Sequence, residues 1–351
     1  MKSLFKLAIM GTQMALMATA LGAELRLDKD GSMSNVPVHH QGNLGTCYAH
    51  AASQATDAYI HTFSRGNQNW HTSTTMLGTE YRDNFITHIF GKNGDIEGGY
   101  VCTSYRRSIK KNGACDESTI EGLLDKMYTG TQRSYRVARI FTDLTLSFNQ
   151  TKKLSRDLGE AAYSQGADKL LAALTQTGAL AAELPSAEEV ARALHSRTNL
   201  QFAHKFFGHL CQHTPRVRLN DTKCRNHHLW LRGKRGLTKL IKEVRARLSK
   251  KNAQPVMISY CGNVLSQGRK YRGLGNTLLD PFKTATCGYH ASAIIGVREQ
   301  GNTTQLLVRN SWGEGCSGYS PDWQCDKGNL WLDAEVLAKN MTDYHLLEGK
   351  R

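Results

Sequence analysis

The spacing of apolar residues changes from helical to strand-like along the chain. Ser186 and Glu189 fit a capping box, which marks the start of a helix. Val190 and Leu194 follow one turn apart on a single face. A later segment repeats the helical spacing with the apolar residues Leu237, Leu240, Ile241, Val244 and Leu248. From Gln254 onward, short apolar runs replace this periodicity and predict strands.

Two helical segments therefore precede a strand-rich end. Residues 36–125 are predicted to be compact and mainly helical, and residues 131–235 to form a second helical segment of different character. The runs that predict strands are "QPVMISYCG", "HASAIIGVRE", "TQLLVRNSW" and "GNLWLDAEVL", and "QGNT" between the second and third is a turn signal. The 351 residues are enough for two lobes with a real core.

Residues 1–23 have the pattern of a secretory signal peptide. Lys2 and Lys6 lead into a Met- and Ala-rich apolar stretch that ends in small residues. Cleavage is expected after Ala20 or Ala23. A membrane anchor is the less favoured interpretation, because the apolar run is short and contains polar residues. No other stretch is long and apolar enough to span a bilayer, so we expect a secreted or periplasmic protein.

The chain is basic, with a formal net charge of +15. Removing the signal peptide removes two lysines and no acid, which lowers the charge to +13. A basic surface attracts anionic polymers and membrane surfaces without identifying one. No nucleic-acid-binding module is visible, so no specific nucleic-acid partner is expected. In the predicted helix over 237–248, basic residues between the apolar positions favour a solvated face over a core rather than an anion site.

Nine cysteines leave at least one thiol unpaired within the molecule. In an oxidising compartment eight can form four disulfides, whose connectivity the sequence does not fix. The pairs with short loops are Cys102–Cys115, Cys211–Cys224, Cys261–Cys287 and Cys316–Cys325, and they leave Cys47 free. A zinc site is an alternative for Cys211, His213, Cys224, His227 and His228. In an exported chain, a Cys211–Cys224 disulfide with surface histidines is favoured over zinc.

Cys47 lies where a loop is predicted to become a helix. Gly42 and Gly45 favour a turn, and the residues after Cys47 are mostly good helix formers. A thiol at a helix N-terminus meets unpaired backbone N–H groups and the positive end of the helix dipole, which favour the thiolate. This position indicates a nucleophile rather than a structural cysteine.

A thiol nucleophile needs a nearby base and a group that orients the base. His290 opens one apolar run and Asn310 ends the next, so adjacent strands would bring the two side chains together at one end of a sheet. The Asn310 side chain can accept the imidazole N–H, and Trp312 would cover this contact from water.

These residues and their neighbours resemble the papain-like cysteine peptidases. The matching segments, in chain order, are Val36-Pro37-Val38, Gln41-Gly42, Cys47, Glu97-Gly98-Gly99-Tyr100, Pro255-Val256, Gly288-Tyr289-His290-Ala291, Asn310-Ser311-Trp312-Gly313 and Lys327-Gly328-Asn329-Leu330. They lie across about residues 36–125 and 236–335. Each segment alone is a weak signal, but the ordered set is specific.

The resemblance implies an α+β fold of two lobes, with the active site between a helical lobe and an antiparallel β lobe. The expected parts of the chain are a signal peptide over 1–23, a helical lobe with the nucleophile over 24–130, a mainly helical insertion over 131–235, and a β-rich lobe over 236–351 with the histidine and the asparagine.

The resemblance also implies roles for individual residues. Cys47 would be the nucleophile and His290 the base and later the acid, while Asn310 would orient His290. The Gln41 side chain and the Cys47 backbone N–H would form the oxyanion hole. The residues expected to bind substrate are Gly98, Gly99 and Trp312. No cofactor and no metal are implied.

The chain departs from the family in two ways. Tyr48-Ala49-His50 replaces the usual Trp-Ala-Phe after the nucleophile, which changes the packing and polarity there but removes no catalytic group. About a dozen residues separate the predicted signal peptide from Val36, where most family members carry a long inhibitory propeptide. We therefore expect control to come from residues 131–235, packed on the sheet lobe or beside the cleft.

The predicted function is a secreted thiol endopeptidase that hydrolyses protein or peptide substrates through an acyl-enzyme on Cys47. An acyl transferase or amidase with the same residues is one alternative. A non-catalytic binding protein on the same fold is another.

Overall fold

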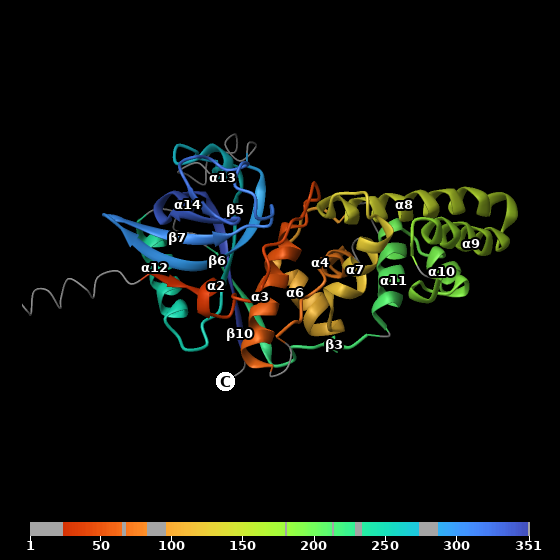
Figure 1. The fold of residues 1–351 in the computed structure, drawn as a ribbon, viewed down its shortest axis with the longest axis horizontal. Helices are drawn as coiled ribbons and strands as arrows, with labels where there is room; N and C mark the ends of the chain where they lie inside the picture. The colour runs from red at the N-terminus through yellow and green to blue at the C-terminus, as the bar shows by residue number, and fades with distance from the viewer. Residues whose placement is uncertain are drawn as a thin grey trace, which may run out of the picture.

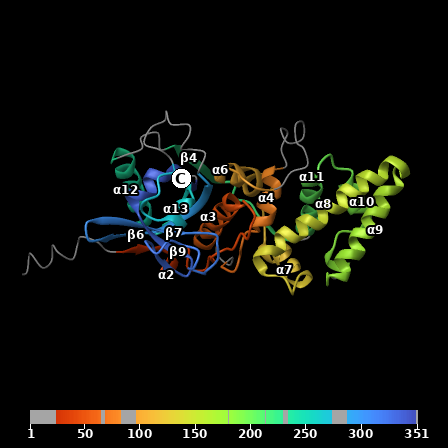
Figure 2. The same cartoon turned by 90° about the horizontal axis from the view of Figure 1, so that it is seen from above.

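The helices and strands form a sheet lobe and a helical lobe, and a helical extension continues from the helical lobe (Figure 1). The computed structural model describes residues 24–64, 68–82, 96–179, 181–212, 214–228, 234–273 and 287–349. The predicted signal peptide and His213 lie outside the described residues. Seen from above, the sheet lobe, the helical lobe and the extension follow one another along the long axis (Figure 2).

The sheet lobe contains the antiparallel sheet predicted from the sequence. Its strands run in the order β4-β10-β5-β6-β7-β9-β8, and β1 pairs with β6. Their bounds are β1 Leu25–Arg26, β4 Thr222–His228, β5 Val256–Cys261, β6 Tyr289–Gln300, β7 Thr303–Arg309, β8 Gln324–Asp326, β9 Asn329–Asp333 and β10 Met341–Gly349. A separate short pair joins β2 Ala114–Cys115 to β3 Arg216–Val217.

The helices fall into three groups. Those of the helical lobe are α3 Cys47–Phe63, α4 Thr74–Arg82, α6 Val101–Tyr105, the π-helix η1 Arg106–Asn112 and α7 Glu117–Met127. Those of the extension are α8 Arg133–Leu158, α9 Ala161–Gln176, the 3-10 turn η2 Ala181–Glu183, α10 Ala187–Leu194 and α11 Asn199–Gln212. Those beside the sheet are α2 Leu27–Asp30, α12 Lys234–Leu248, α13 Asn263–Gln267 and α14 Ala334–Asn340.

The position of strand β6 between two helices explains why its sequence is continuously apolar instead of alternating between apolar and polar residues. Every residue from His290 to Val297 is buried, because both α3 and α12 pack against β6. A strand that is covered on both faces has no solvent-facing positions. The contact with α3 also brings the N-terminal end of that helix, and hence Cys47, to the start of β6.

The helices of the predicted insertion pack on the helical lobe. We expected residues 131–235 to lie on the sheet lobe or beside the cleft. The sheet-lobe expectation is wrong: α8 contacts α7, and α11 contacts α4 and α7, so the extension points away from the sheet (Figures 1 and 2). The start of α8 lies near the Gln41 loop, because Arg136, Val137 and Gln41 line one cavity. Buried aromatic residues of this unit include Phe148, Phe202, Phe206 and Phe207. After the helices, β4 returns to pair with β10 at the edge of the sheet.

Four disulfides are present, and they correct two of the predicted pairs. The observed pairs are Cys102–Cys224, Cys115–Cys211, Cys261–Cys287 and Cys316–Cys325. The short-loop pairs Cys102–Cys115 and Cys211–Cys224 are wrong, because the chain folds back after α11 and brings distant cysteines together. Since Cys211 and Cys224 are both oxidised, neither can supply a thiolate to zinc. No helix among the described residues has the length and apolar character needed to cross a membrane.

Candidate active site

Cys47 is the first residue of α3, as the sequence predicts. It is the free cysteine of the chain and is buried. It belongs to the same buried cluster as Ala291, which directly follows His290 on β6. The structure therefore brings the thiol of the helical lobe to the strand that carries the histidine.

His290 is hydrogen-bonded to Asn310, as expected for two adjacent strands. The distance from His290 Nε2 to Asn310 Oδ1 is 2.6 Å, and both residues are buried. Asn310 Oδ1 also accepts from Ser292 Oγ at 3.2 Å, and Asn310 Nδ2 donates to Tyr319 Oη at 3.1 Å. Because the amide oxygen accepts, the neutral ring carries its proton on Nε2. The lone pair of Nδ1 is then free to take a proton from a nucleophile.

The backbone around His290 is fixed by close packing. Gly262 donates its N–H to Gly288 O at 2.8 Å, and a side chain on Gly262 would begin 2.7 Å from the Cβ of His290. The disulfide Cys261–Cys287 joins the same two segments covalently. Together these contacts restrict where the imidazole can lie.

Trp312 covers the histidine–asparagine pair. Its ring centroid lies 5.3 Å from that of His290, and the ring stacks on Tyr319 at 5.5 Å. The expected shielding by Trp312 is therefore present. Tyr319 is a contributor that sequence reasoning missed, because it lies in a loop without any periodic signal. Ser292 was also missed, although its position two residues after His290 on a strand places it on the same face.

Gln41 is held beside the same segment. Its backbone N–H donates to Ser311 O at 2.8 Å, and Gly313 N donates to His39 O at 2.8 Å. In the side chain, Gln41 Oε1 accepts from Ser311 Oγ at 2.6 Å, and Nε2 donates to Leu44 O at 2.6 Å. A side-chain amide has two N–H donors, so one N–H of Gln41 remains for a ligand.

Gly98 and Gly99 lie next to the loop that precedes Cys47. Gly98 N donates to Gly45 O at 2.8 Å, and Gly98 has a positive φ of 69°, which favours glycine. A side chain on Gly99 would begin 2.9 Å from the ring of Tyr48. Both glycines are exposed, so their backbone is open to an extended ligand.

Burial opposes charge on both members of the candidate pair. It raises the pKa of the Cys47 thiol, although the backbone amides of Ala291 and Tyr48 act in the opposite direction. It also lowers the pKa of His290 to about 4, against the hydrogen bond to Asn310, which raises it. The sequence argument expected the helix N-terminus and a protonated histidine to favour the thiolate, and it did not include burial. Thiolate and imidazolium can then form only together, where each charge stabilises the other.

Two further histidines, His39 and His50, form a pair directly behind the nucleophile. His50, one turn after Cys47, places its Nδ1 at 3.2 Å from Nδ1 of His39, and both rings are buried. Burial lowers the pKa of His50 well below its usual value, and the neighbouring histidines add to this effect. Two facing nitrogens can share one proton but not two. This pair shows the changed polarity that the Tyr48-Ala49-His50 segment indicated.

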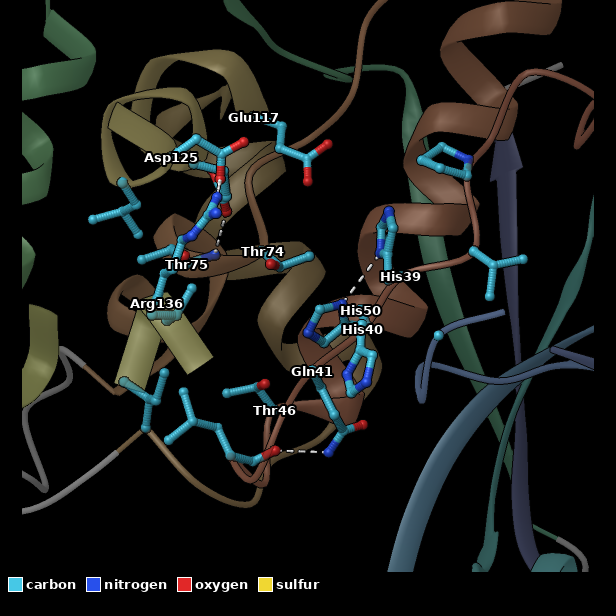
Figure 3. A pocket seen from close by; sticks show the side chains of 18 of the residues that line it. His39, His40, Gln41, Thr46, His50, Thr74, Thr75, Glu117, Asp125 and Arg136 are labelled. Carbon is cyan, nitrogen blue, oxygen red and sulfur yellow. Dashed lines mark hydrogen bonds and ion pairs between the residues drawn. The ribbon is translucent and has the colours of Figure 1, made fainter. Parts of the chain in front are cut away.

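The histidine pair borders a cavity of about 330 Å³ between the Gln41 loop, α4, α7 and the start of α8 (Figure 3). On its far wall Arg136 forms an ion pair with Asp125. Glu121 also lines the cavity, and burial raises the pKa of its carboxyl to about 8. Among the described residues, no group of three or more histidine, cysteine or acidic side chains is arranged to hold a metal ion.

Several solved structures that are similar to this chain are proteases. Bromelain from Ananas comosus, in complex with the E64 inhibitor, shares 12% identity and a TM-score of 0.42, over 93% of this chain and 98% of that chain. Digestive procathepsin L2 proteinase from Tenebrio molitor shares 13% identity with this chain at a TM-score of 0.45. The match covers 93% of this chain and 67% of that chain. The clostridial cysteine protease Cwp84 shares 14% and 0.42, over 90% of this chain and 56% of that chain. No protein-family model and no curated protein matches the sequence.

The lobes themselves have the expected arrangement, with Cys47 starting a helix of one lobe and His290 and Asn310 on adjacent strands of the other. This is the α+β arrangement of two lobes that the resemblance to the papain-like peptidases implies. The helical extension α8–α11 is packed on α4 and α7 of the helical lobe.

Proposed function

We propose that the protein is a secreted thiol endopeptidase. The observation that carries the proposal is the packing of Cys47, at the N-terminus of α3, against the start of β6, where His290 is held by Asn310. A buried thiol beside a base that is itself oriented by a third group has the arrangement of an activated nucleophile.

The reaction begins with proton transfer from the Cys47 thiol to Nδ1 of His290. The sulfur attacks the carbonyl carbon of the peptide bond, and the oxyanion is stabilised by the Cys47 backbone N–H and the remaining N–H of Gln41. His290 then gives its proton to the leaving amine, and an acyl-enzyme remains on Cys47. Water, deprotonated by His290, attacks the acyl carbon and releases the acid.

The exposed backbone of Gly98 and Gly99 supports an extended peptide as the substrate. An extended chain pairs with another backbone through main-chain hydrogen bonds, independently of its side chains. Trp312 lies at the other side of the histidine and can contact the leaving part of the substrate. The substrate class that fits is therefore an unfolded protein or a peptide, without a defined side-chain preference.

Secretion is supported by two independent features. Residues 1–23 have the pattern of a signal peptide, and eight cysteines are paired in four disulfides. Disulfides form and persist in oxidising compartments such as the periplasm or the extracellular space. A free thiol in such a compartment, retained at a helix N-terminus, suits a nucleophile.

The test is hydrolysis of an unstructured protein by the purified mature chain, with fragments identified by mass spectrometry. We expect fragments from the wild type and none from Cys47→Ala, while His195→Ala, a histidine of the extension far from β6, serves as a control with full activity. The bromelain structure contains the inhibitor E64, and we expect the same compound to label Cys47 and block hydrolysis.

The alternatives give different results in the same experiment. An acyl transferase or amidase would be labelled at Cys47 but would leave peptide bonds intact. A binding protein would be neither labelled by E64 nor active. Either result would overturn the endopeptidase proposal.

A further inference from the structure

A basic groove of about 760 Å³ lies at the opposite end of α3 from Cys47. It is formed where the C-terminal part of α3, the edge strand β4, the end of α12 and strand β10 meet. The residues that line it are Tyr59, Phe63, Lys223, Arg225, Arg247, Lys250, Asn252, Gln254, Leu347, Glu348 and Gly349. All of them belong to the described part of the chain.

Positive charge exceeds negative charge in this groove. Four cationic side chains face one carboxylate, that of Glu348, which lies 2.8 Å from Arg225 Nε and 3.8 Å from Arg247 Nη2. Lys223 and Lys250 are exposed, and no carboxylate within the described ranges forms an ion pair with either of them. The groove therefore attracts anions.

Two buried polar side chains in the groove have unused hydrogen-bonding groups. Arg247 is only 8% exposed and donates from Nη2 to Leu347 O at 3.1 Å, yet its Nε has no partner among the described residues. Gln254 is 7% exposed and donates from Nε2 to Thr62 Oγ1 at 2.9 Å, while no described residue pairs with its Oε1. Buried donors and acceptors are normally satisfied. Arg247 and Gln254 therefore keep one donor and one acceptor beside the groove that the described residues do not pair.

An aromatic pair forms one wall of the groove. The rings of Tyr59 and Phe63 lie 4.5 Å apart, and Phe63 is 47% exposed. Both come from α3, four residues apart and therefore on the same face. A free aromatic face beside a row of cations is the arrangement by which proteins bind single-stranded nucleic acid, since bases stack on the rings and phosphates meet the cations.

We propose that this groove binds single-stranded nucleic acid without sequence preference. Lys223, Arg225 and Lys250 would contact phosphates, Arg247 and Gln254 would bind polar groups of the strand, and Phe63 would stack on a base. The groove favours a single strand over a duplex, because only unstacked bases can reach the ring of Phe63. A lipid surface would not use the buried groups of Arg247 and Gln254.

The site is independent of the candidate active site. Helix α3 has 17 residues, and at about 1.5 Å per residue its two ends lie roughly 25 Å apart. An oligonucleotide in the groove would not enter the peptidase cleft. Binding would therefore hold the protein on an anionic polymer while the cleft stays open, and it does not depend on the proposed endopeptidase activity.

The experiment measures binding of a fluorescent twelve-nucleotide oligo-dT by anisotropy at several salt concentrations. The variant Lys223→Ala/Lys250→Ala is compared with Lys153→Ala/Lys169→Ala, which removes two exposed lysines from the extension and so matches the change in net charge. We expect the groove variant to bind about tenfold more weakly, with a salt slope smaller by about 1.4, from about 0.7 for each phosphate contact. The control variant should keep its affinity and slope.

The aromatic wall is tested by Phe63→Ala, which we expect to weaken oligo-dT binding by about tenfold because one base loses its stacking partner. Equal losses in both double-lysine variants would show general attraction to a basic surface and overturn the proposal. So would stronger binding of a duplex, or of a sulfated glycan whose affinity does not change in Phe63→Ala. Absence of oligo-dT binding at low salt would also overturn it.

Discussion

The hydrogen bond between His290 and Asn310 decides which nitrogen of the imidazole is available. With the proton held on Nε2, the ring offers Nδ1 to the thiol of Cys47. Burial works against a charge on either group alone, so the histidine is required for the thiolate to form near neutral pH. The helix N-terminus supports this thiolate but does not replace the imidazolium.

Loss of His290 should make Cys47 less reactive than an ordinary cysteine. In His290→Ala the thiol loses its proton acceptor, while burial still raises its pKa. We expect iodoacetamide at pH 6 to alkylate Cys47 of the wild type faster than free cysteine, whose pKa is about 8.5, and Cys47 of the variant more slowly. Mass spectrometry of timed samples measures both rates, with His195→Ala as the control. Equal rates in wild type and His290→Ala would contradict the proposed pair.

Gln41 should affect hydrolysis but not alkylation. Its free N–H is proposed to stabilise the oxyanion, and one such donor is worth ~10²–10³-fold in rate. Alkylation by iodoacetamide forms no oxyanion, so Gln41→Ala should hydrolyse peptide slowly while Cys47 reacts with iodoacetamide at nearly the wild-type rate. Parallel loss of both reactions would mean that Gln41 acts by holding the Ser311 segment rather than by binding the oxyanion.

At the scale of elements, two long-range disulfides fix the helical extension and the strand that follows it. Cys115–Cys211 joins the β2 strand to the end of α11, and Cys102–Cys224 joins α6 to β4. These bonds close the path by which the chain leaves the helical lobe and returns to the sheet. The short bond Cys316–Cys325 restrains only a loop.

The long-range bonds should contribute more stability than the short one. The sequence separation is 96 for Cys115–Cys211 and 9 for Cys316–Cys325. In the chain-entropy description these loops correspond to about 4.7 and about 2.7 kcal/mol. We expect replacement of both cysteines by alanine to lower the urea midpoint more at the first pair than at the second. A larger loss at Cys316–Cys325 would contradict this explanation.

At the scale of the whole molecule, buried titratable groups lower the stability of the folded protein at both low and high pH. Burial lowers the pKa of His290 and of His345 to about 4 and that of His50 well below 6.5. The unfolded chain therefore binds more protons below pH 6.5, and stability falls as the pH drops toward 4. Glu121, with its pKa raised to about 8, and Asp57, also raised, have the opposite effect. The contribution of these two carboxyl groups to stability is lost as the pH rises from about 4.5 to 8.

These opposing groups predict maximal stability near pH 6.5. Thermal unfolding between pH 4.5 and 9 should show a highest Tm near this value and lower values on both sides. In Glu121→Gln the neutral side chain keeps an acceptor for Ser73 and Thr75 but cannot ionise, so the fall on the alkaline side should become smaller. A Tm profile unchanged by Glu121→Gln would contradict the raised pKa of this carboxyl.

Several features could be predicted from local sequence because they depend on neighbours along the chain. The start of α3 at Cys47 follows from a glycine turn before a run of helix formers. The approach of His290 and Asn310 follows from two strands joined by a short turn, which must lie side by side. The disulfides Cys261–Cys287 and Cys316–Cys325 were predicted correctly, and each joins segments of the sheet lobe that are close along the chain.

Other features were decided only by the tertiary structure, because they join residues far apart in the sequence. Once α8–α11 have packed on α7 and α4, Cys102 pairs with Cys224, and Cys115 pairs with Cys211. The basic helix over 237–248 was expected to present a solvated face, and Lys239 and Lys242 are exposed, but Arg247 is buried against β10. No local pattern encodes such a contact, because the free energy of burying a side chain depends on which surface the rest of the chain brings to it.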